Sequence, residues 1–264
     1  MSGFSAEWLA MREPVDHASI NHRVRDALKS RFLGRSALRV VDLGSGTGSN
    51  LRGLSPDLPG GQSWTLVDYD DRLLGRASAP PGVEVDKLQR DLSSGDISDL
   101  VTGADLVTAS ALFDLVAEGV IGRMVGQIAE ARATFYTVLT YDGGATWLPS
   151  HSRDALMRAA FNRHQRSDKG FGPAAGPDAT AALAAAFQAA GYRVTRGKSP
   201  WVLAGEHGEL RRAVDDGWAG AVRETGELSE RDVDEWVAHR HRSDNAVTIV
   251  GHEDLLAFPA TGAD

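Results

Sequence analysis

Cysteine is absent from this chain of 264 residues, which excludes disulfides, thiolate zinc sites and cysteine nucleophiles. No apolar run approaches the roughly 20 residues that a helix needs to span a bilayer, so we expect no membrane partner. The chain has fewer basic than acidic residues, with 28 Lys and Arg and 36 Asp and Glu. Since the resulting net charge of −8 repels phosphate backbones, we expect no nucleic-acid partner either.

Length and composition suit one sizeable domain with a core. Hydrophobic residues make up 42% of the chain and charged residues 24%, which are ordinary proportions for a globular protein. Residues 1–12 lack the basic-then-apolar order of a secretion signal, and we therefore expect a cytoplasmic enzyme. The sequence leaves a monomer and a homodimer both open.

Short apolar runs alternate with helical stretches through the first half of the chain. We expect N-terminal helices over residues 5–32, with a break near Pro14. Strands are expected at residues 38–43, 63–67, 83–88, 104–109 and 133–140, separated by helical stretches such as 116–131. This alternation predicts βαβ units and a parallel sheet.

The last third of the chain has a different pattern. It predicts a helix at 178–191, a strand at 192–203, mostly helix over 206–242 and a strand at 246–258. Two late strands that enclose a helical insertion indicate an antiparallel addition at the edge of the sheet.

Three glycines at alternate positions follow the first expected strand, where residues 40–50 read VVDLGSGTGSN. Glycine lets the backbone turn sharply and lets a ligand approach without a Cβ in the way. The helix that follows would present free backbone N–H groups to that ligand. Asp68 ends the second expected strand, 20 residues after Gly48, where an acid can accept both hydroxyls of a ribose. The pattern therefore predicts a nucleoside-binding site.

Two nucleoside cofactors compete for this loop. A dinucleotide fingerprint needs G-x-G-x-x-G/A, and Gly44 and Gly46 fit it, but Ser49 stands at the closing position. Asp42, two residues before the first glycine, is poorly placed for an anionic pyrophosphate. It suits a cofactor that carries an ammonium and a sulfonium. Charge therefore favours S-adenosylmethionine (SAM) over NAD, and an NAD(P)-dependent oxidoreductase stays as the alternative.

At these residues the sequence resembles the class I SAM-dependent methyltransferases. Residues 40–48 resemble their first motif, 66–69 their second, 89–92 the acidic turn after the third strand and 105–113 their fourth motif. The resemblance covers about residues 37–140. It implies an α/β fold, a Rossmann-like three-layer αβα sandwich. The implied sheet has seven strands, mostly parallel with strand 7 antiparallel, with N-terminal helices and a helical insertion before the last strand.

The resemblance also assigns roles to residues around the cofactor. Asp68 would bind the ribose, Tyr69 would pack on the adenine, and Asp91 would hydrogen-bond to it. Ser110 would line the side that faces the methyl group. The full set of expected cofactor-binding residues is Asp42, Gly44, Ser45, Gly46, Gly48, Asn50, Asp68, Tyr69, Asp91, Leu92 and Ser110.

The methyl acceptor is harder to predict, because methyl transfer requires no special nucleophile from the protein. The Asn/Asp-Pro-Pro-Tyr motif for planar amino groups is absent after the fourth strand, where residues 110–115 read SALFDL. This departure resembles methyltransferases that act on small molecules. Asp114 is a candidate base or cation anchor, although it could equally cap the helix from residue 116.

The segment after the fifth strand supplies further candidates, since it leaves the edge where ligands of open α/β sheets bind. A helix expected at 154–165 carries Phe161 and His164 on one face, and glycines at 170 and 172 could hinge a lid. We expect residues 161–172 to form the acceptor side, with His164 as the base because histidine titrates near neutral pH. Asp114 and Tyr141 are the other catalytic candidates, and the alternative is a solvated loop.

We therefore expect a single methyltransferase domain over residues 1–264. Its parts are a helical cap (1–35), a SAM-binding half (36–141), an acceptor-side insertion (142–176) and the C-terminal half of the sheet (177–260), with a helical insertion (206–242). No metal site is expected, because His239 and His241 point different ways on a helix, and His252 is expected at a turn in a structural or solvent-exposed role. A non-catalytic SAM-binding protein is a further alternative, since an intact loop indicates binding and not turnover.

Overall fold

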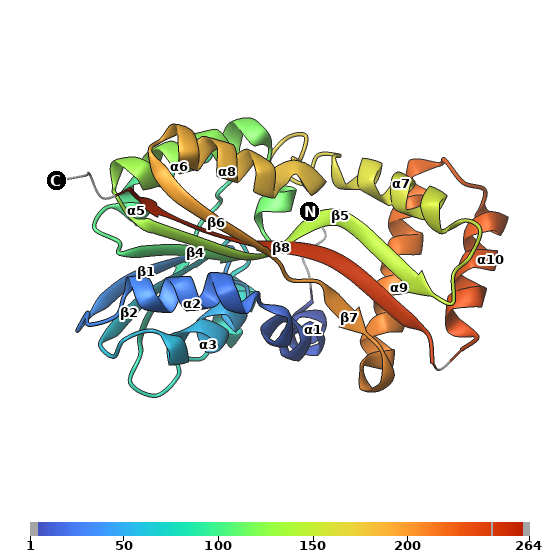
Figure 1. The fold of residues 1–264 in the computed structure, drawn as a ribbon, viewed down its shortest axis with the longest axis horizontal. Helices are drawn as coiled ribbons and strands as arrows, with labels where there is room; N and C mark the ends of the chain where they lie inside the picture. Colours follow the sequence, from blue (N-terminus) through green and yellow to red (C-terminus); the bar gives the residue numbers. More distant parts are fainter. Residues whose placement is uncertain (1–4, 244, 261–264) are drawn as a thin grey trace.

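The computed structural model describes residues 5–243 and 245–260, which form a sheet covered by helices on both faces (Figure 1). Within these residues, eight strands follow the order β3-β2-β1-β4-β5-β8-β6, and β7 pairs with β8. Strands β1 to β5 pair in parallel, whereas β8 runs antiparallel to β5, β6 and β7. The predicted seven-stranded Rossmann-like sheet is confirmed, and β7 is an additional short strand.

The strands lie close to the predicted positions in the first half of the chain and depart from them later. β1 (Leu38–Leu43), β2 (Gln62–Asp68), β3 (Glu84–Gln89) and β4 (Leu106–Ser110) are short. β5 (Thr134–Leu148) runs well past its expected end at residue 140. The expected strand 192–203 is divided into β6 (Tyr192–Lys198) and β7 (Trp201–Leu203), because Pro200 has no N–H to donate. β8 (Val247–Pro259) completes the sheet.

Two hydrophobic clusters lie on opposite faces of the central sheet and make the three layers. α2 (His22–Arg31), α3 (Ser49–Leu54) and α4 (Asp71–Arg76) cover one face. α5 (Ser98–Val101), α6 (Glu118–Glu130) and α8 (Ala179–Ala189) cover the other. Since successive strand residues point to opposite faces, Val40 joins the first cluster and Val41 the second.

The long strands β5 and β8 extend past the central sheet and carry β7 with them, toward the right of Figure 1. Helices α7 (Asp154–Gln165), α9 (Gly208–Thr225) and α10 (Glu230–His241) pack on this extension. Trp147 lies between Trp218 and Trp236, with ring centroids 4.9 and 5.3 Å away, so aromatic packing anchors the helices. The expected helical insertion over 206–242 thus forms α9 and α10.

The N-terminal helix α1 (Ala6–Ser19) is continuous through Pro14, so the predicted break there is wrong. Proline removes one hydrogen bond from the helix, but contacts of α1 with α3 and β7 hold the segment helical. Helix α1 ends at Ser19, with Ile20 as its C-cap. The Asn21 side chain then caps α2 by accepting the N–H of Val24.

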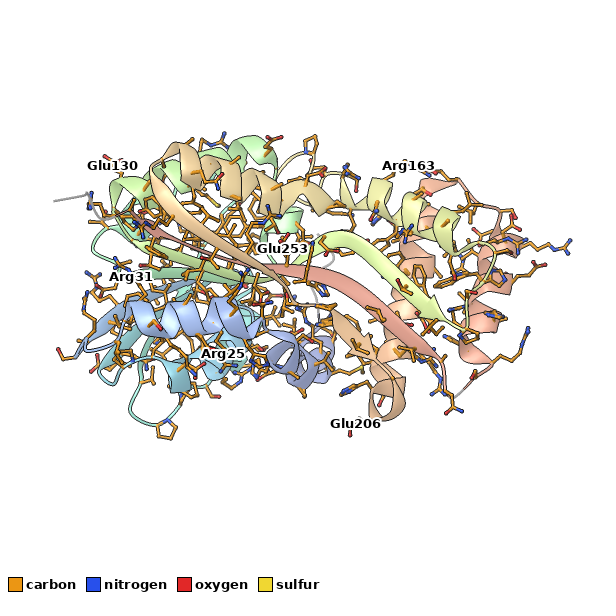
Figure 2. The ribbon with its side chains drawn as sticks, in the orientation of Figure 1. Arg25, Arg31, Glu130, Arg163, Glu206 and Glu253 are labelled. Atoms are coloured by element: carbon orange, nitrogen blue, oxygen red, sulfur yellow. The ribbon has the colours of Figure 1, made fainter. Side chains whose placement is uncertain are left out.

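Charged side chains reach outward at the periphery, as at Arg31, Glu130, Arg163 and Glu206 (Figure 2). Among the described residues, no helix combines the length and apolar character needed to cross a membrane.

Candidate functional site

The glycine loop connects β1 to α3 at the carboxyl end of the parallel strands. Gly44, Gly46 and Gly48 have φ of 65°, 53° and 78°, in the left-handed region that favours glycine. The N–H of Ser45 donates to the carbonyl of Val67 at 3.0 Å and holds the loop against β2. The predicted loop is therefore formed, with backbone conformations that other residues adopt only with strain.

Asp68 connects the end of β2 to this loop. Its Oδ2 accepts the N–H of Gly46 at 2.7 Å, and its Oδ1 accepts the N–H of Asp70 at 2.9 Å. Asp70 caps α4 by accepting the N–H of Arg72, which leaves Asp68 free for the loop. Each carboxylate oxygen can accept a further hydrogen bond, so Asp68 keeps capacity for a ribose.

The expected adenine-binding residues lie around the ends of β2 and β3. Tyr69 is 59% exposed, which leaves its ring accessible for stacking on a ligand. Asp91 is exposed and accepts the N–H of Ser93 at 2.8 Å, while Leu92 is buried behind it. All three residues therefore follow the carboxyl ends of β2 and β3, at the same end of the sheet as the glycine loop.

Asp42 is fully buried beneath the loop. Its Oδ1 accepts the Nδ2–H of Asn50 at 3.0 Å, and the same amide donates to Thr108 at 2.9 Å. Burial raises the pKa of Asp42 to about 7, the hydrogen bond from Asn50 opposes this rise, and the charge of Asp68 adds to it. Oδ2 of Asp42 and Oγ of Ser45 are buried without a hydrogen-bond partner among the described residues. Two such orphaned acceptors indicate a polar ligand with hydrogen-bond donors.

Asp114 lies just past β4, where Ser110 ends the strand half-buried. The carboxylate is buried, and its Oδ1 has no partner among the described residues. Burial raises the pKa of Asp114 to about 6, and the charge of Arg12 opposes the rise. The alternative that Asp114 caps the next helix is wrong, because α6 begins at Glu118 after Ala117, without a side-chain cap.

His252 lies in the middle of β8, directly opposite Tyr141 of β5, and not at the turn that the sequence predicts. Its ring centroid is 6.4 Å from that of Tyr141 and 5.0 Å from that of Trp201. Burial, together with the charge of Arg12, lowers the pKa of His252 to about 3, so the ring is neutral. Its Nδ1 is buried without a partner among the described residues.

Helix α1 packs on the glycine loop and covers it. A Cβ placed on Gly46 would stand 3.2 Å from Cδ1 of Leu9. Glu13 accepts two hydrogen bonds from Arg52 at 2.7 and 2.6 Å, and Arg52 also donates to the carbonyl of Thr47 at 2.6 Å. The N-terminal cap therefore lies over the loop through both apolar and ionic contacts.

The predicted acceptor segment divides into two environments. Tyr141 donates its hydroxyl to Oδ1 of Asn162 at 2.7 Å, and Phe161 packs edge-on against the Tyr141 ring at 5.6 Å. His164 instead contacts Glu224 of α9 at 2.9 Å and the ammonium of Lys169 at 3.2 Å. Helix α7 therefore joins Tyr141 through Asn162 and Phe161, while its histidine faces α9.

The expected hinge glycines form a closed turn. Gly170 and Gly172 both donate their N–H groups to Oδ1 of Asp168, at 2.7 and 3.1 Å. Their φ angles of 103° and 84° require glycine, so the turn explains both residues.

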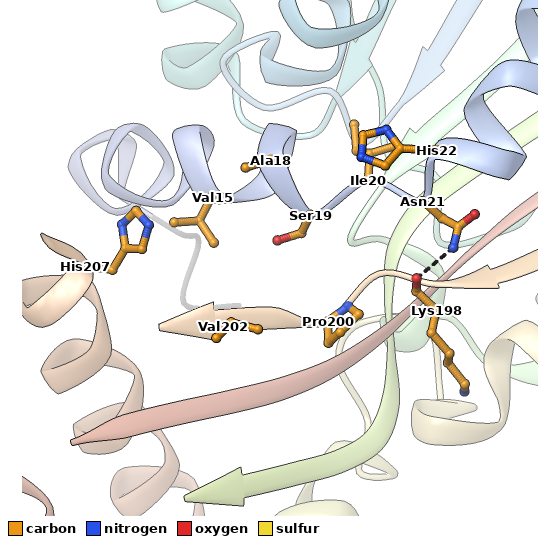
Figure 3. A pocket seen from close by; sticks show the side chains of 10 residues that line it. All are labelled: Val15, Ala18, Ser19, Ile20, Asn21, His22, Lys198, Pro200, Val202 and His207. Atoms are coloured by element: carbon orange, nitrogen blue, oxygen red, sulfur yellow. Dashed lines mark hydrogen bonds between the residues drawn. The ribbon is translucent and has the colours of Figure 1, made fainter. Parts of the chain in front are cut away.

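A surface pocket of about 360 Å³ lies between α1, the start of α2 and β7 (Figure 3). Asn21 donates to the carbonyl of Lys198 at 2.9 Å across one side of it. A second pocket, of about 300 Å³, lies beside Asp70 and is lined by Glu7 and Arg76. Neither pocket is lined by Asp42 or Asp114, because α1 packs directly over the glycine loop.

Solved structures share this arrangement of sheet and helices. A cyclopropane-fatty-acyl-phospholipid synthase-like protein from Lactobacillus casei has a TM-score of 0.56 at 14% identity, covering 97% of this chain and 95% of its own. A cyclopropane synthase from Mycobacterium tuberculosis has a TM-score of 0.53 at 12% identity, covering 96% and 94%. A SAM-dependent methyltransferase from Geobacter sulfurreducens has a TM-score of 0.50 at 14% identity, covering 98% and 100%.

The fold is that of the class I SAM-dependent methyltransferases. No protein-family model matches the sequence, and no curated protein matches it. At 12 to 14% identity these likenesses establish the architecture, and the chemistry has to be argued from the site itself.

Arg12 and His252 are polar residues of this site that the sequence interpretation missed. Arg12 stands three residues after Leu9 and four before Asp16, so all three share one helix face. Two charged residues on the same helix face as an apolar residue can be recognised from the sequence, and they indicate that a polar group is turned toward the interior. His252 gives no such signal, because its neighbours come from distant parts of the chain.

Proposed function

We propose that this protein transfers a methyl group from SAM to a small-molecule acceptor. The observation that carries the proposal is the free Oδ2 of Asp42, buried beneath three glycines and close enough to Asp68 for their charges to interact. Such an anion would stabilise a cofactor with an ammonium and a sulfonium, and would repel a pyrophosphate. The Geobacter sulfurreducens methyltransferase of the same fold was solved with S-adenosyl-L-homocysteine (SAH), in line with this choice.

The residues present fit that cofactor. Asp42 and Ser45 offer orphaned acceptors, Asp68 offers capacity for a ribose, and the three glycines hold the loop in the left-handed conformation with no Cβ on its backbone. When bound, SAM supplies a methyl group that is already electrophilic. The protein then has to orient the acceptor, exclude water and take a proton where the acceptor has one to lose.

Asp114 is the residue best placed to take that proton. Its Oδ1 is free and buried, and a pKa of about 6 leaves the carboxylate ionised at neutral pH yet still basic. Tyr141 is held by Asn162 and packs against the ring of His252, so it is better suited to shape the acceptor space. Its pKa is raised by burial, which keeps the phenol protonated. His164 remains the alternative base and is tested separately.

Calorimetry with SAH, SAM and NADH tests the cofactor. We expect SAH and SAM to bind and NADH not to bind, and the reverse result would replace the proposal with an oxidoreductase. Incubation with labelled SAM and metabolite extracts then tests turnover, because a labelled product identifies the acceptor. SAH binding without transfer to any fraction would instead support a non-catalytic SAM-binding protein.

A further inference from the structure

Arg12 lies on the inward face of α1, between the glycine loop and β7. Leu9, one turn earlier, approaches Gly46, and Asp16, one turn later, is buried. Nε of Arg12 donates to Oδ2 of Asp16 at 2.7 Å, and the guanidinium carbon lies 5.2 Å from the ring centroid of Trp201. The Arg12 side chain is only 11% exposed, so it is committed to the interior.

Most of this guanidinium has no hydrogen-bond partner in the part of the chain that the structure describes. Among the described residues, Nε is the only side-chain nitrogen of Arg12 that donates a hydrogen bond. A buried guanidinium is normally satisfied on several sides, since it carries five N–H donors. The free Nη1 and Nη2 form the planar edge that grips a carboxylate with two parallel hydrogen bonds. Asp16 and Trp201 fix the plane of that edge, so little rotamer freedom remains to be lost on binding.

Three residues near Arg12 carry buried polar atoms that have no partner among the described residues. These atoms are Oδ1 of Asp114, Nδ1 of His252 and Nε1 of Trp201, from the segment after β4, from β8 and from β7. The charge of Arg12 acts on both Asp114 and His252, which places it within range of the candidate base. Three elements besides α1 therefore bring unsatisfied polar atoms to the surroundings of one arginine.

We propose that Arg12 is a carboxylate anchor, which holds the carboxylate of a ligand beside the inward face of α1 through Nη1 and Nη2. A monoanion is favoured over a phosphate, because Asp16 and Asp114 would both repel a dianion. The inference rests on the proposed function. Two ligands of that reaction can bring a carboxylate, namely the methionine part of SAM and an acceptor acid.

Calorimetry separates these two sources. If the carboxylate belongs to SAM, Arg12→Gln weakens SAM binding by at least about tenfold and leaves decarboxylated SAM within about twofold. If it belongs to the acceptor, Arg12→Gln leaves SAM binding unchanged. Wild-type protein saturated with SAH then binds benzoate but not benzamide, and the variant loses that selectivity.

The inference is overturned if wild type binds SAM while Arg12→Gln changes neither the preference for SAM over its decarboxylated form nor the binding of benzoate. Failure of the cofactor assignment gives a different result, since wild type would then not bind SAM at all, and failure of methyl transfer alone appears in the labelled-SAM assay and not in these binding measurements. Arg31→Gln is the matched control, because Arg31 also lies over an aromatic ring, 5.3 Å from the centroid of Phe258, on the exposed face of α2.

Two further variants keep the test independent of folding. Arg12→Lys retains the charge beside Asp16 but lacks the two-pronged edge, and we expect it to lose most of the carboxylate selectivity. Arg12→Gln leaves the Asp16 carboxylate buried without its ion-pair partner. If that variant does not fold, the double variant Arg12→Gln/Asp16→Asn removes this charge, and it should show the same loss of selectivity.

Discussion

Gly46 donates its backbone N–H to Oδ2 of Asp68 at 2.7 Å and so joins the glycine loop to the end of β2. The acid expected to bind ribose therefore also braces the loop that would hold the rest of the cofactor. Loss of Asp68 would loosen the loop as well as remove a ligand contact. Asp91 has no such second role among the described residues, since it accepts a hydrogen bond from Ser93 in its own turn.

We therefore expect Asp68→Ala to weaken SAH binding more than Asp91→Ala does. Each lost charge-assisted hydrogen bond costs about 1.5–3 kcal/mol, so Asp68→Ala should lower the affinity by about tenfold or more. Calorimetry on both variants measures the difference. Equal affinities for wild type and Asp68→Ala would show that the ribose site lies elsewhere.

The first half of the fold could be predicted from the sequence because its signals are local. β1 occupies the predicted residues, and α7 begins and ends as predicted, since apolar runs and helix patterns report on their own segment. Gly251 shows where this fails. A Cβ on Gly251 would stand 2.0 Å from Oδ1 of Asp142, so the glycine permits close packing within a strand and does not mark a turn. His252 was misplaced for the same reason.

The candidate site divides in the same way. The glycine loop follows a compact motif, and the structure brings Asp42, Gly44 and Asp68 together around it. The polar surroundings of Arg12 draw on α1, β7 and β8, and more than half of the chain separates α1 from the two strands. Nothing in one sequence specifies that such segments meet, because long-range pairing depends on the whole sheet.

Asp42→Asn should stabilise the ligand-free protein at pH 8. With its folded pKa raised to about 7, above the ordinary value near 3.8, Asp42 keeps its proton in the folded state after the unfolded chain has lost it. The free energy of unfolding therefore decreases as pH rises from about 4 to 7. The neutral side chain of Asp42→Asn removes this decrease. The expected gain at pH 8 is on the order of 2–4 kcal/mol. Urea unfolding at pH 5 and pH 8 measures it, with exposed Asp71→Asn as the control.

The same substitution should weaken SAM binding if, as we propose, the ionised carboxylate attracts the cationic cofactor. Wild-type affinity for SAM should rise as pH increases through about 7, and the variant should lose this dependence. A variant that gains stability and still binds SAM with wild-type pH dependence would contradict the role given to Asp42.

Glu13→Gln should release α1 from the glycine loop. It removes the charge that accepts two hydrogen bonds from Arg52, in an ion pair that is mostly shielded from solvent. We expect SAH to dissociate about 3- to 10-fold faster, measured by stopped-flow displacement. Glu7→Gln is the control on the same helix, because the ion pair of Glu7 with Arg76 is largely exposed and contributes little. Equal dissociation rates in all three proteins would mean that α1 does not retain the ligand.

Asp114→Asn should lower methyl transfer more than His164→Ala does, once an acceptor is in hand. Asp114 is buried with a free oxygen and lies within range of the Arg12 charge, whereas the His164 ring is taken up by Glu224 and Lys169. Removal of a general base typically costs about 100- to 10,000-fold in rate. SAH affinity measured alongside separates a lost base from a damaged fold, since both variants should bind SAH like wild type.

The pH profile decides between the two residues where the rates alone do not. A base at Asp114 must be ionised, so kcat/KM for the acceptor, measured at saturating SAM, should rise with pH through the pKa of about 6 and then level off. The neutral amide of Asp114→Asn cannot titrate, and that rise should disappear from its residual activity. In His164→Ala the rise should persist, because Asp114 is still present. A profile that loses its rise in His164→Ala and keeps it in Asp114→Asn would assign the proton transfer to His164 and move the acceptor site to the α7 side of the molecule.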